Sequence, residues 1–226
     1  MKRNCVNTFA ILIRLTLGTV LAFASLGFSA AQEEEDTSTK PIIIDTDMAL
    51  DDWLAILYLL QRPEVDVLAV TVTGAGEAHC EPGVQNALGL LALAGNPDIP
   101  IACGRETPLQ GDHTFPQWLR DYVDTLLGLE LPANPNPAFD GSAVDLLTSA
   151  IQESSEKVTV VTLGPLTNIA EAFETDPTLI GNIEMIYIMG GAVDVPGNVG
   201  FMVSGNDAAE ANIYVDPSAA AAVLAN

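Results

Sequence analysis

Four aspartates stand within eight residues directly after a short apolar run, and their types and spacing suit them to chemistry. The run at 42–44 is β-branched and predicts a buried parallel strand. Asp45, Asp47, Asp51 and Asp52 follow it. Carboxylates this close repel one another unless a hard divalent cation lies among them, because Ca²⁺ and Mg²⁺ bind carboxylate oxygens at about 2.0–2.6 Å. The stretch therefore indicates a metal-binding or catalytic site.

The apolar run at 53–60, which ends before Pro63, predicts a helix with Asp51 and Asp52 at its N-terminus. Acidic residues there stabilise a helix by about 0.3–1 kcal/mol each, which would explain these two without any ligand. Helix capping does not explain the two earlier aspartates. A strand, an acidic loop and a helix place the loop at the carboxyl end of a strand, where ligands bind in open α/β sheets.

Two other acidic motifs begin in the same way. An EF-hand loop also starts with Asp-x-Asp, but it needs Gly at its sixth position and Glu at its twelfth, where this chain has Leu50 and Ile56. We exclude it. A phosphohydrolase of the haloacid dehalogenase type, with Asp45 as nucleophile and Mg²⁺ as cofactor, stays open as an alternative, although Met48 and Ala49 stand where it would carry Gly-Thr or a similar pair.

Composition bounds the class of protein. The 226 residues, 49% of them hydrophobic, fit one domain with a large core. The formal net charge of −22 would repel phosphate backbones and anionic lipid, so nucleic acid and membrane surfaces are excluded as partners.

The N-terminus has the pattern of a secretory signal peptide at 1–31, with a basic start, an apolar stretch at 15–28 and small residues before the cleavage point. An uncleaved membrane anchor is the alternative. Residues 32–40 indicate an acidic linker, and 41–226 one domain. We therefore expect an exported protein, periplasmic or secreted, without stable membrane association after cleavage.

Cysteines and histidines give weak signals. After the leader, Cys80 and Cys103 could pair or could be buried singly, and both alternatives remain open. His79 and His113 fall in expected loops, where a histidine acts as an acid or ligand less often than it bonds locally.

Strands alternate with helices along the rest of the chain, which predicts parallel βαβ units. The expected fold class is α/β, with a doubly wound, mostly parallel open sheet of the Rossmann-like kind. Further strands are expected at 65–72, 98–102, 158–163 and 184–189, and helices at 84–94, 117–127, 143–153 after a Ser142 cap, and 166–173.

A glycine-rich loop follows the last of these strands, at 189–191. Asn198, Asn206, Glu210 and Asn212 come next, and amides with a carboxylate at a strand end suit a hydroxyl-rich ligand. Asn and Gly are also ordinary turn residues, so this pattern alone leaves both interpretations open.

Five segments together carry a family resemblance. The stretch 45–52, Asp-Thr-Asp-Met-Ala-Leu-Asp-Asp, resembles the Asp-x-Asp-Pro-Gly-x-Asp-Asp signature of the inosine-uridine preferring nucleoside hydrolases. Segments 163–168, 189–191, 197–199 and 209–217 resemble the later motifs of that family, in the same order. The resemblance implies hydrolysis of the N-ribosidic bond of a nucleoside around a bound Ca²⁺, by a protein that is a homo-oligomer at full length.

By position, the resemblance implies that Asp47 is the general base that activates water and also a metal ligand. Asp52 would be a bidentate Ca²⁺ ligand, and the backbone carbonyl of Leu163 a further one. Asp45 would have a structural role. The groups that would hold the ribose hydroxyls are Asp51, Asn198, Glu210 and Asn212.

The chain also departs from the family pattern. Met48 and Ala49 replace Pro-Gly, the ribose-contacting Asn after the second strand has no match in 74–77, and 200–206 resembles an insertion. The family's domain continues past Asn226 to a His-Asp pair whose Asp binds Ca²⁺. We therefore expect this chain to hold Ca²⁺ loosely, to be nearly inactive, and to expose apolar faces of the sheet and of the Ala-rich segment 219–225 until the downstream segment is restored. A binding protein that retains the ribose site without turnover is the other alternative.

Overall fold

The structure is a computed structural model that describes residues 39–226. The expected signal peptide and the expected linker up to residue 38 lie outside the described residues. The first strand begins at Lys40, the last residue of that expected linker. Within 39–226, no helix combines the length and the apolar character needed to cross a bilayer.

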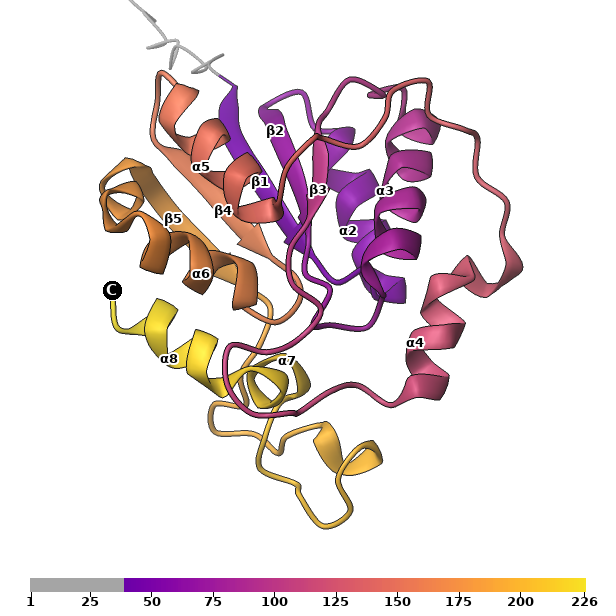
Figure 1. Cartoon of the computed structure of the whole chain (residues 1–226), viewed down its shortest axis with the longest axis vertical. Helices are drawn as coiled ribbons and strands as arrows, with labels where there is room; N and C mark the ends of the chain where they lie inside the picture. The colour runs from indigo at the N-terminus through magenta and orange to yellow at the C-terminus, as the bar shows by residue number, and fades with distance from the viewer. Residues whose placement is uncertain (1–38) are drawn as a thin grey trace, which may run out of the picture. The chain divides into compact units, whose positions relative to one another are not determined.

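A five-stranded parallel sheet forms the centre of the described chain (Figure 1). The strand order is β3-β2-β1-β4-β5 and every neighbouring pair is parallel, which confirms the expected doubly wound α/β fold. The strands are β1 (Lys40–Thr46), β2 (Val65–Val72), β3 (Ile101–Cys103), β4 (Val158–Thr162) and β5 (Ile183–Ile188).

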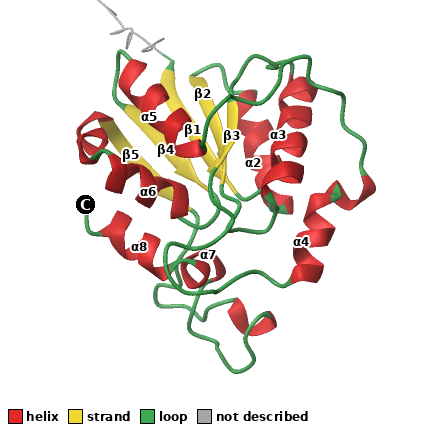
Figure 2. Ribbon diagram, in the orientation of Figure 1, coloured by secondary structure: helices red, strands yellow, loops and turns green. Residues whose placement is uncertain are grey.

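Helices cover both faces of the sheet (Figure 2). α2 and α3 pack on one face, and α5, α6 and α8 pack on the other. The helices are α2 (Leu50–Leu60), α3 (Cys80–Ala94), α4 (Gln117–Asp124), α5 (Ala143–Glu153), α6 (Thr167–Thr175), α7 (Ala211–Val215) and α8 (Pro217–Leu224), with short 3-10 turns η1 (Leu126–Gly128), η2 (Pro177–Asn182) and η3 (Val199–Phe201).

β1 shows why the sheet has two cores. Successive side chains of a strand point to opposite faces, so Ile42 and Ile44 join the core under α2 and α3 while Ile43 joins the core under α5 and α6. Ile43 and Ile44 are fully buried. An apolar run without polar alternation is what a central parallel strand covered on both faces requires.

The Ala-rich segment near the C-terminus is buried on one side and exposed on the other, where Leu224 is 68% exposed, so that expectation is right only in part. Ala219, Ala220 and Val223 of α8 are buried in the core that also contains α6. Small side chains let two helices approach closely, and Asp216 caps α8 by accepting from the Ala219 amide at 2.9 Å. Exposed apolar side chains also lie on β5, where Tyr187 is 61% exposed.

The helix expected at 117–127 is shorter in the structure. α4 ends at Asp124, because Leu126 and Leu127 both adopt positive φ, at 49° and 55°. Such a conformation is uncommon for a residue with a side chain and cannot continue a right-handed helix. The buried side chain of Leu126 packs into the core and holds this turn.

The Ser142 cap of α5 is confirmed and supports a stability prediction. The Ser142 hydroxyl accepts from the Asp145 amide, and the Asp145 carboxylate accepts from the Ser142 amide, which makes a complete capping box. Replacing Ser142 by Ala should lower the free energy of unfolding by about 1 kcal/mol. Urea denaturation measures this loss. Ser149→Ala on the same helix is the matched control, and an equal loss there would contradict the capping role.

Candidate functional site

The acidic loop lies where the direction of chain winding reverses. β1 pairs with β2 on one side and with β4 on the other, so the carboxyl ends of β1 and β4 flank the topological switch point. Open α/β sheets bind ligands in the crevice outside the strand ends at this point. Leu163 follows β4 directly, and its amide donates to the Asp45 carbonyl at 2.7 Å, which joins the two strand ends.

A strained turn carries the chain from β1 into α2. Met48 has a φ of 61° and is fully buried, which is uncommon for a residue with a side chain. Two hydrogen bonds hold it there, because its amide donates to Thr46 Oγ1 at 2.9 Å and its carbonyl accepts from Trp53 Nε1 at 3.0 Å. Met48-Ala49 thus makes this turn without a Pro-Gly pair.

Asp45 lies inside the protein and does not line the site. Its Oδ1 accepts from Thr71 Oγ1 at 2.6 Å and from Asn168 Nδ2 at 2.8 Å. Burial raises the pKa of this carboxyl to about 7, although these two hydrogen bonds oppose the rise. Asn168 also donates to the Val72 carbonyl, so Asp45 and Asn168 together connect β1, β2 and α6. The structural role expected for Asp45 agrees with this geometry.

Asp47 is buried with one carboxylate oxygen bound and the other free. Oδ2 accepts from the Glu77 amide at 3.0 Å, while Oδ1 has no hydrogen-bond partner among the described residues. Burial raises the pKa of Asp47 well above its usual value, and the nearby carboxylates of Asp52 and Glu77 raise it further. A buried acceptor without a donor is costly, so Oδ1 is suited to a ligand.

Asp51 and Asp52 both start α2 but face different surroundings. Asp51 is exposed. Asp52 is buried, and its Oδ2 accepts from Thr46 Oγ1 at 2.5 Å. Burial is the largest cause that raises the pKa of Asp52, to about 6. Stabilisation of the helix N-terminus is therefore enough to explain the exposed Asp51. It does not explain why the Asp52 carboxylate is buried away from water.

A cavity of about 160 Å³ brings all seven expected site residues together. A larger hollow of about 640 Å³ beside the 129–138 segment is lined by apolar and amide side chains without a charged group, so it offers no comparable chemistry. The smaller cavity is lined by Asp47, Ala49, Asp51, Asp52, Glu77, Phe115, Leu163, Met189, Asn198, Glu210, Ala211 and Asn212.

The wall opposite the acidic loop comes from α7 and the segment before it. Glu210 accepts from the amides of Asn212, Ile213 and Gly191 at 3.0–3.1 Å, which caps α7 and fixes the glycine-rich loop. Asn198 Oδ1 accepts from the Ala211 amide at 2.8 Å. These side chains therefore have a structural role as well as a place in the cavity wall.

Asn212 closes the same wall against the acidic loop. Its Nδ2 donates to the Leu163 carbonyl at 2.9 Å and to the Met189 carbonyl at 3.2 Å. Asn206, by contrast, does not line the cavity, because its Oδ1 accepts from the Ala208 and Ala209 amides in a turn.

The sequence did not assign Glu77, Phe115 or Met189 to the site. Glu77 adds a carboxylate whose pKa burial raises to about 7, with further contributions from Asp52 and Asp51. Its position in the loop after β2, next to β1 in the sheet, was the available signal. Phe115 lies in a loop without a local pattern and reaches the cavity only through the tertiary fold.

Both histidines contact distant segments of the chain and not their own loops, so the expected local bonding is not observed. His79 Nδ1 lies 2.7 Å from Asp124 Oδ2, and His113 Nδ1 lies 2.7 Å from the Tyr214 carbonyl. The His113 and Tyr214 rings also stack with centroids 4.2 Å apart. Neither histidine lines the cavity.

The donor set at the cavity fits a hard cation. Asp47 offers a free buried oxygen, Asp52 offers a second carboxylate, and the Leu163 carbonyl has a lone pair beyond the one that accepts from Asn212. Oxygen donors of this kind, completed by water, are those that Ca²⁺ prefers. Within 39–226, no three His, Cys, Asp or Glu side chains are already gathered as a metal cluster, so carbonyl and water oxygens would have to contribute.

A family model described as inosine-uridine preferring nucleoside hydrolase matches residues 42–226. The chain belongs to the inosine-uridine preferring nucleoside hydrolase family. The match covers the acidic loop, both strand ends of the switch point and the α7 wall of the cavity. It does not support the haloacid dehalogenase alternative.

Curated relatives of this nucleoside hydrolase chain are similar over most of its length. The pyrimidine-specific ribonucleoside hydrolase RihA of Salmonella paratyphi A is 41% identical over 187 residues, 81% of this chain and 56% of that protein. Uridine nucleosidase 1 of Arabidopsis thaliana is 39% identical over 188 residues, 82% of this chain and 53% of that protein. The chain thus spans about half the length of the curated relatives it matches.

Solved nucleoside hydrolase structures share the fold. A plant nucleoside hydrolase superposes with a TM-score of 0.70 at 41% identity, covering 81% of this chain and 56% of that one. An inosine-uridine preferring nucleoside hydrolase from Bacillus anthracis gives 0.70 at 26% identity, covering 82% and 61%. These neighbours agree with the doubly wound sheet and with membership in the nucleoside hydrolase family.

Proposed function

We propose that this protein hydrolyses the N-glycosidic bond of ribonucleosides to free base and ribose, with Asp47 as the general base and Ca²⁺ as cofactor. The observation that carries the proposal is the free, buried Oδ1 of Asp47 in an acid-lined cavity at the switch point of the sheet. Membership in the nucleoside hydrolase family and the names of the relatives support the reaction class.

Asp47, Asp52 and the carbonyl of Leu163 are the groups that would hold the cation. When bound, Ca²⁺ would offset the charge of the crowded carboxylates and make a neighbouring water a stronger acid. Asp52 is already oriented by Thr46 and Leu163 by its link to β1, so both donors are fixed before any ligand arrives.

Asp47 would take the proton of the attacking water. Burial raises the pKa of Asp47, but a bound Ca²⁺ would oppose that rise, so the place of Asp47 in the cavity, and not its pKa, supports the role of general base. The glycosidic bond breaks through an oxocarbenium-like transition state, in which the ribose ring gains positive charge. The carboxylates of Asp51 and Glu210 face the same cavity and would stabilise that charge.

Asp51, Asn198, Glu210 and Asn212 would bind the ribose hydroxyls. Replacing Glu210 or Asn212 by Ala should weaken binding of free ribose by about 1–3 kcal/mol each, because each change leaves a sugar hydroxyl unpaired in the site. Isothermal titration calorimetry with ribose measures the affinity.

Glu184→Ala, on exposed β5, is the control for the ribose measurement. Because Glu210 also caps α7, the melting temperature of each variant is recorded, and the titration is done well below it. Unchanged ribose affinity in a folded Glu210→Ala protein would remove Glu210 from the sugar site.

A reducing-sugar assay over a panel of purine and pyrimidine ribonucleosides tests the reaction. We expect ribose release that is lost after removal of divalent cations with EDTA and restored by Ca²⁺, on this chain or on a version that includes any downstream sequence of its gene. Release of phosphate from a phosphomonoester instead would overturn the proposal. Ribonucleoside binding without ribose release would favour a non-catalytic binding protein.

We also propose that the protein works outside the cytoplasm, in the periplasm or after secretion. The leader pattern at 1–31 motivates this, and the disulfide between Cys80 and Cys103 supports it. Structural disulfides persist in oxidising compartments and are rare in the cytosol. Fractionation of the native host followed by immunodetection tests the location, and an exclusively cytosolic signal would contradict it.

A further inference from the structure

Residues 74–80, called the 74–80 loop below, lead from β2 into the first residue of α3 and pack directly against Asp47. The Glu77 amide donates to Asp47 Oδ2, and the Ala78 amide donates to the Asp47 carbonyl at 3.0 Å. A side chain on Gly76 would lie 2.1 Å from the Asp47 Cβ, so only glycine allows this approach. The position of the loop therefore sets which carboxylate oxygen of Asp47 is bound and which is left without a partner.

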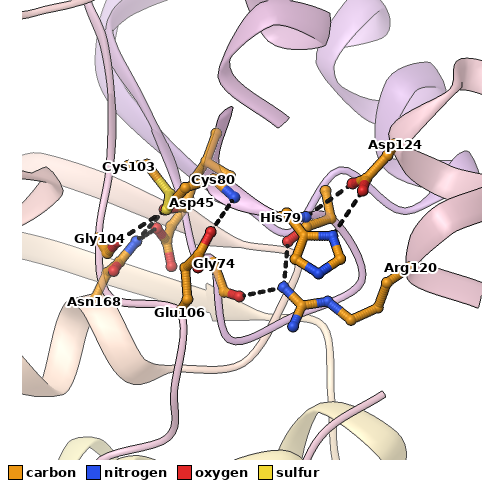
Figure 3. Close-up of a disulfide and its surroundings, with 12 residues drawn as sticks. Asp45, Gly74, His79, Cys80, Cys103, Gly104, Glu106, Arg120, Asp124 and Asn168 are labelled. Carbon is orange, nitrogen blue, oxygen red and sulfur yellow. Dashed lines mark hydrogen bonds and ion pairs between the residues drawn. A yellow bond between two sulfur atoms is a disulfide. The ribbon is translucent and has the colours of Figure 1, made fainter. Parts of the chain in front are cut away.

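α4 holds the 74–80 loop through Arg120. Figure 3 shows the guanidinium reaching the loop from the side of α4. Its Nη2 donates to the Gly74 carbonyl at 2.7 Å and to the Ala78 carbonyl at 3.1 Å. These two carbonyls flank Gly76 and Glu77, the residues that contact the Asp47 side chain. One nitrogen thus fixes both ends of the segment that orients the carboxylate.

A second contact from the same helix secures the end of the loop (Figure 3). Asp124 accepts from the His79 amide at 2.9 Å, and its other oxygen lies 2.7 Å from His79 Nδ1. Arg120 and Asp124 are four residues apart, so they share one face of α4. That face therefore holds the loop at Gly74, Ala78 and His79.

The burial of Arg120 argues that the contact is not a device for stability alone. Arg120 is 6% exposed and forms no direct ion pair within the described part of the chain. Burial lowers the pKa of Arg120, and the nearby carboxylates of Glu106, Asp124 and Asp47 offset part of that fall. A buried charge without a direct ion pair still costs free energy that an apolar side chain of similar size would not cost. The Gly74 and Ala78 carbonyls, which accept from Arg120, lie on the segment that orients Asp47. The buried guanidinium can therefore serve to position that segment.

We propose that Arg120 is a positioning residue for Asp47. It holds the 74–80 loop so that the Glu77 amide binds Oδ2 and leaves Oδ1 without a hydrogen-bond partner. The inference rests on the proposed role of Asp47 as general base, but the loop contact can be tested without that role.

Hydrogen exchange tests the contact in the intact protein. In Arg120→Met, which keeps most of the side-chain volume but removes the donors, amides of 73–80 should exchange at least about tenfold faster than in the unsubstituted protein, as expected for local opening. Exchange in β1 and α5 should stay within twofold. Arg62→Met, which removes an exposed charge at the end of α2, is the matched control and should change neither region. The proposal would be overturned if exchange became faster throughout the protein, or if exchange in 73–80 did not become faster.

A double-mutant cycle with Asp47 tests the link to catalysis. Arg120→Met should lower kcat by about 10- to 100-fold, the scale of a displaced catalytic group, with ribose affinity within about threefold. In the Asp47→Asn background the same change should cost less than about threefold in kcat, because the group it positions is already disabled. Equal losses in both backgrounds would show a general structural role and refute the proposal.

Arg120→Lys covers the case in which Arg120→Met does not fold. Lysine keeps the charge and can donate to one or both carbonyls. Amides of 73–80 should therefore exchange faster than in the unsubstituted protein, but by less than about tenfold. The value of kcat should fall by less than about 10-fold. In the double variant Asp124→Asn and Arg120→Lys, unsubstituted values of both the exchange rate in 73–80 and kcat would refute the contact. If no protein of the series hydrolyses ribonucleosides, with or without any downstream sequence of the gene, the proposed function fails, while the exchange measurement still decides whether Arg120 holds the loop.

Discussion

Asp47→Asn should lower the turnover of ribonucleosides by about 10²–10⁴-fold, the usual loss on removal of a general base. Asparagine keeps the shape and one oxygen of the side chain, and that oxygen can still accept from the Glu77 amide. What it loses is the basic carboxylate. We therefore expect kcat to collapse while the affinity for free ribose changes by only a few-fold, as measured by steady-state kinetics and calorimetry.

Asp66→Asn is the matched control, because it makes the same chemical change at an exposed position of β2, away from the cavity. It should leave kcat unaltered. A protein that retains its rate within a few-fold after Asp47→Asn would not use Asp47 as its base, and the unpartnered Oδ1 would then need another explanation.

Loss of the Cys80–Cys103 disulfide should lower the free energy of unfolding by about 3 kcal/mol. The bond joins the first residue of α3 to the last residue of β3 across 23 positions of sequence, so it restricts the unfolded chain substantially. For a domain of this size that loss lowers the melting temperature by about 6–12 °C. Calorimetry of a Cys80→Ala and Cys103→Ala double variant measures it.

Reductant provides the internal control for the disulfide measurement. A thiol reductant should lower the melting temperature of the unsubstituted protein toward that of the double variant and should leave the variant itself unchanged. If neither the two substitutions nor the reductant changes the melting temperature, the bond does not form in solution or does not contribute to stability.

The strand and helix order and the acidic loop could be predicted because their signals are local. Three β-branched residues before Asp45 predict a buried strand, and β1 continues through Asp45 to Thr46 before the acidic loop begins. β2 was predicted with its observed bounds, since Val65–Val72 combines β-branched residues with a Pro before it and a Gly after it. The family motifs then supplied roles for residues as distant as Asp47 and Asn212.

The remaining features depend on contacts that no short pattern records. The pairing of Cys80 with Cys103, the contact of Arg120 with the 74–80 loop and the burial of Ala219 all join distant segments. Leu126 and Leu127 have side chains that favour helix, and tertiary packing overrides that preference. Positive φ at a leucine has no sequence signal.

The central position of β1 also constrains the order in which the molecule can fold. β1 pairs with β2 after a short crossover, but its pairing with β4 brings Ile42 beside Thr159 and closes a long loop. Closing long loops between parallel strands is the slow step in folds rich in distant contacts. The half of the site that carries the aspartates can thus form early, whereas Leu163 and the α7 wall join it only after the late closure. The proposed nucleoside and cation would need both halves, so we expect them to bind only chains that have completed folding and not to nucleate the fold.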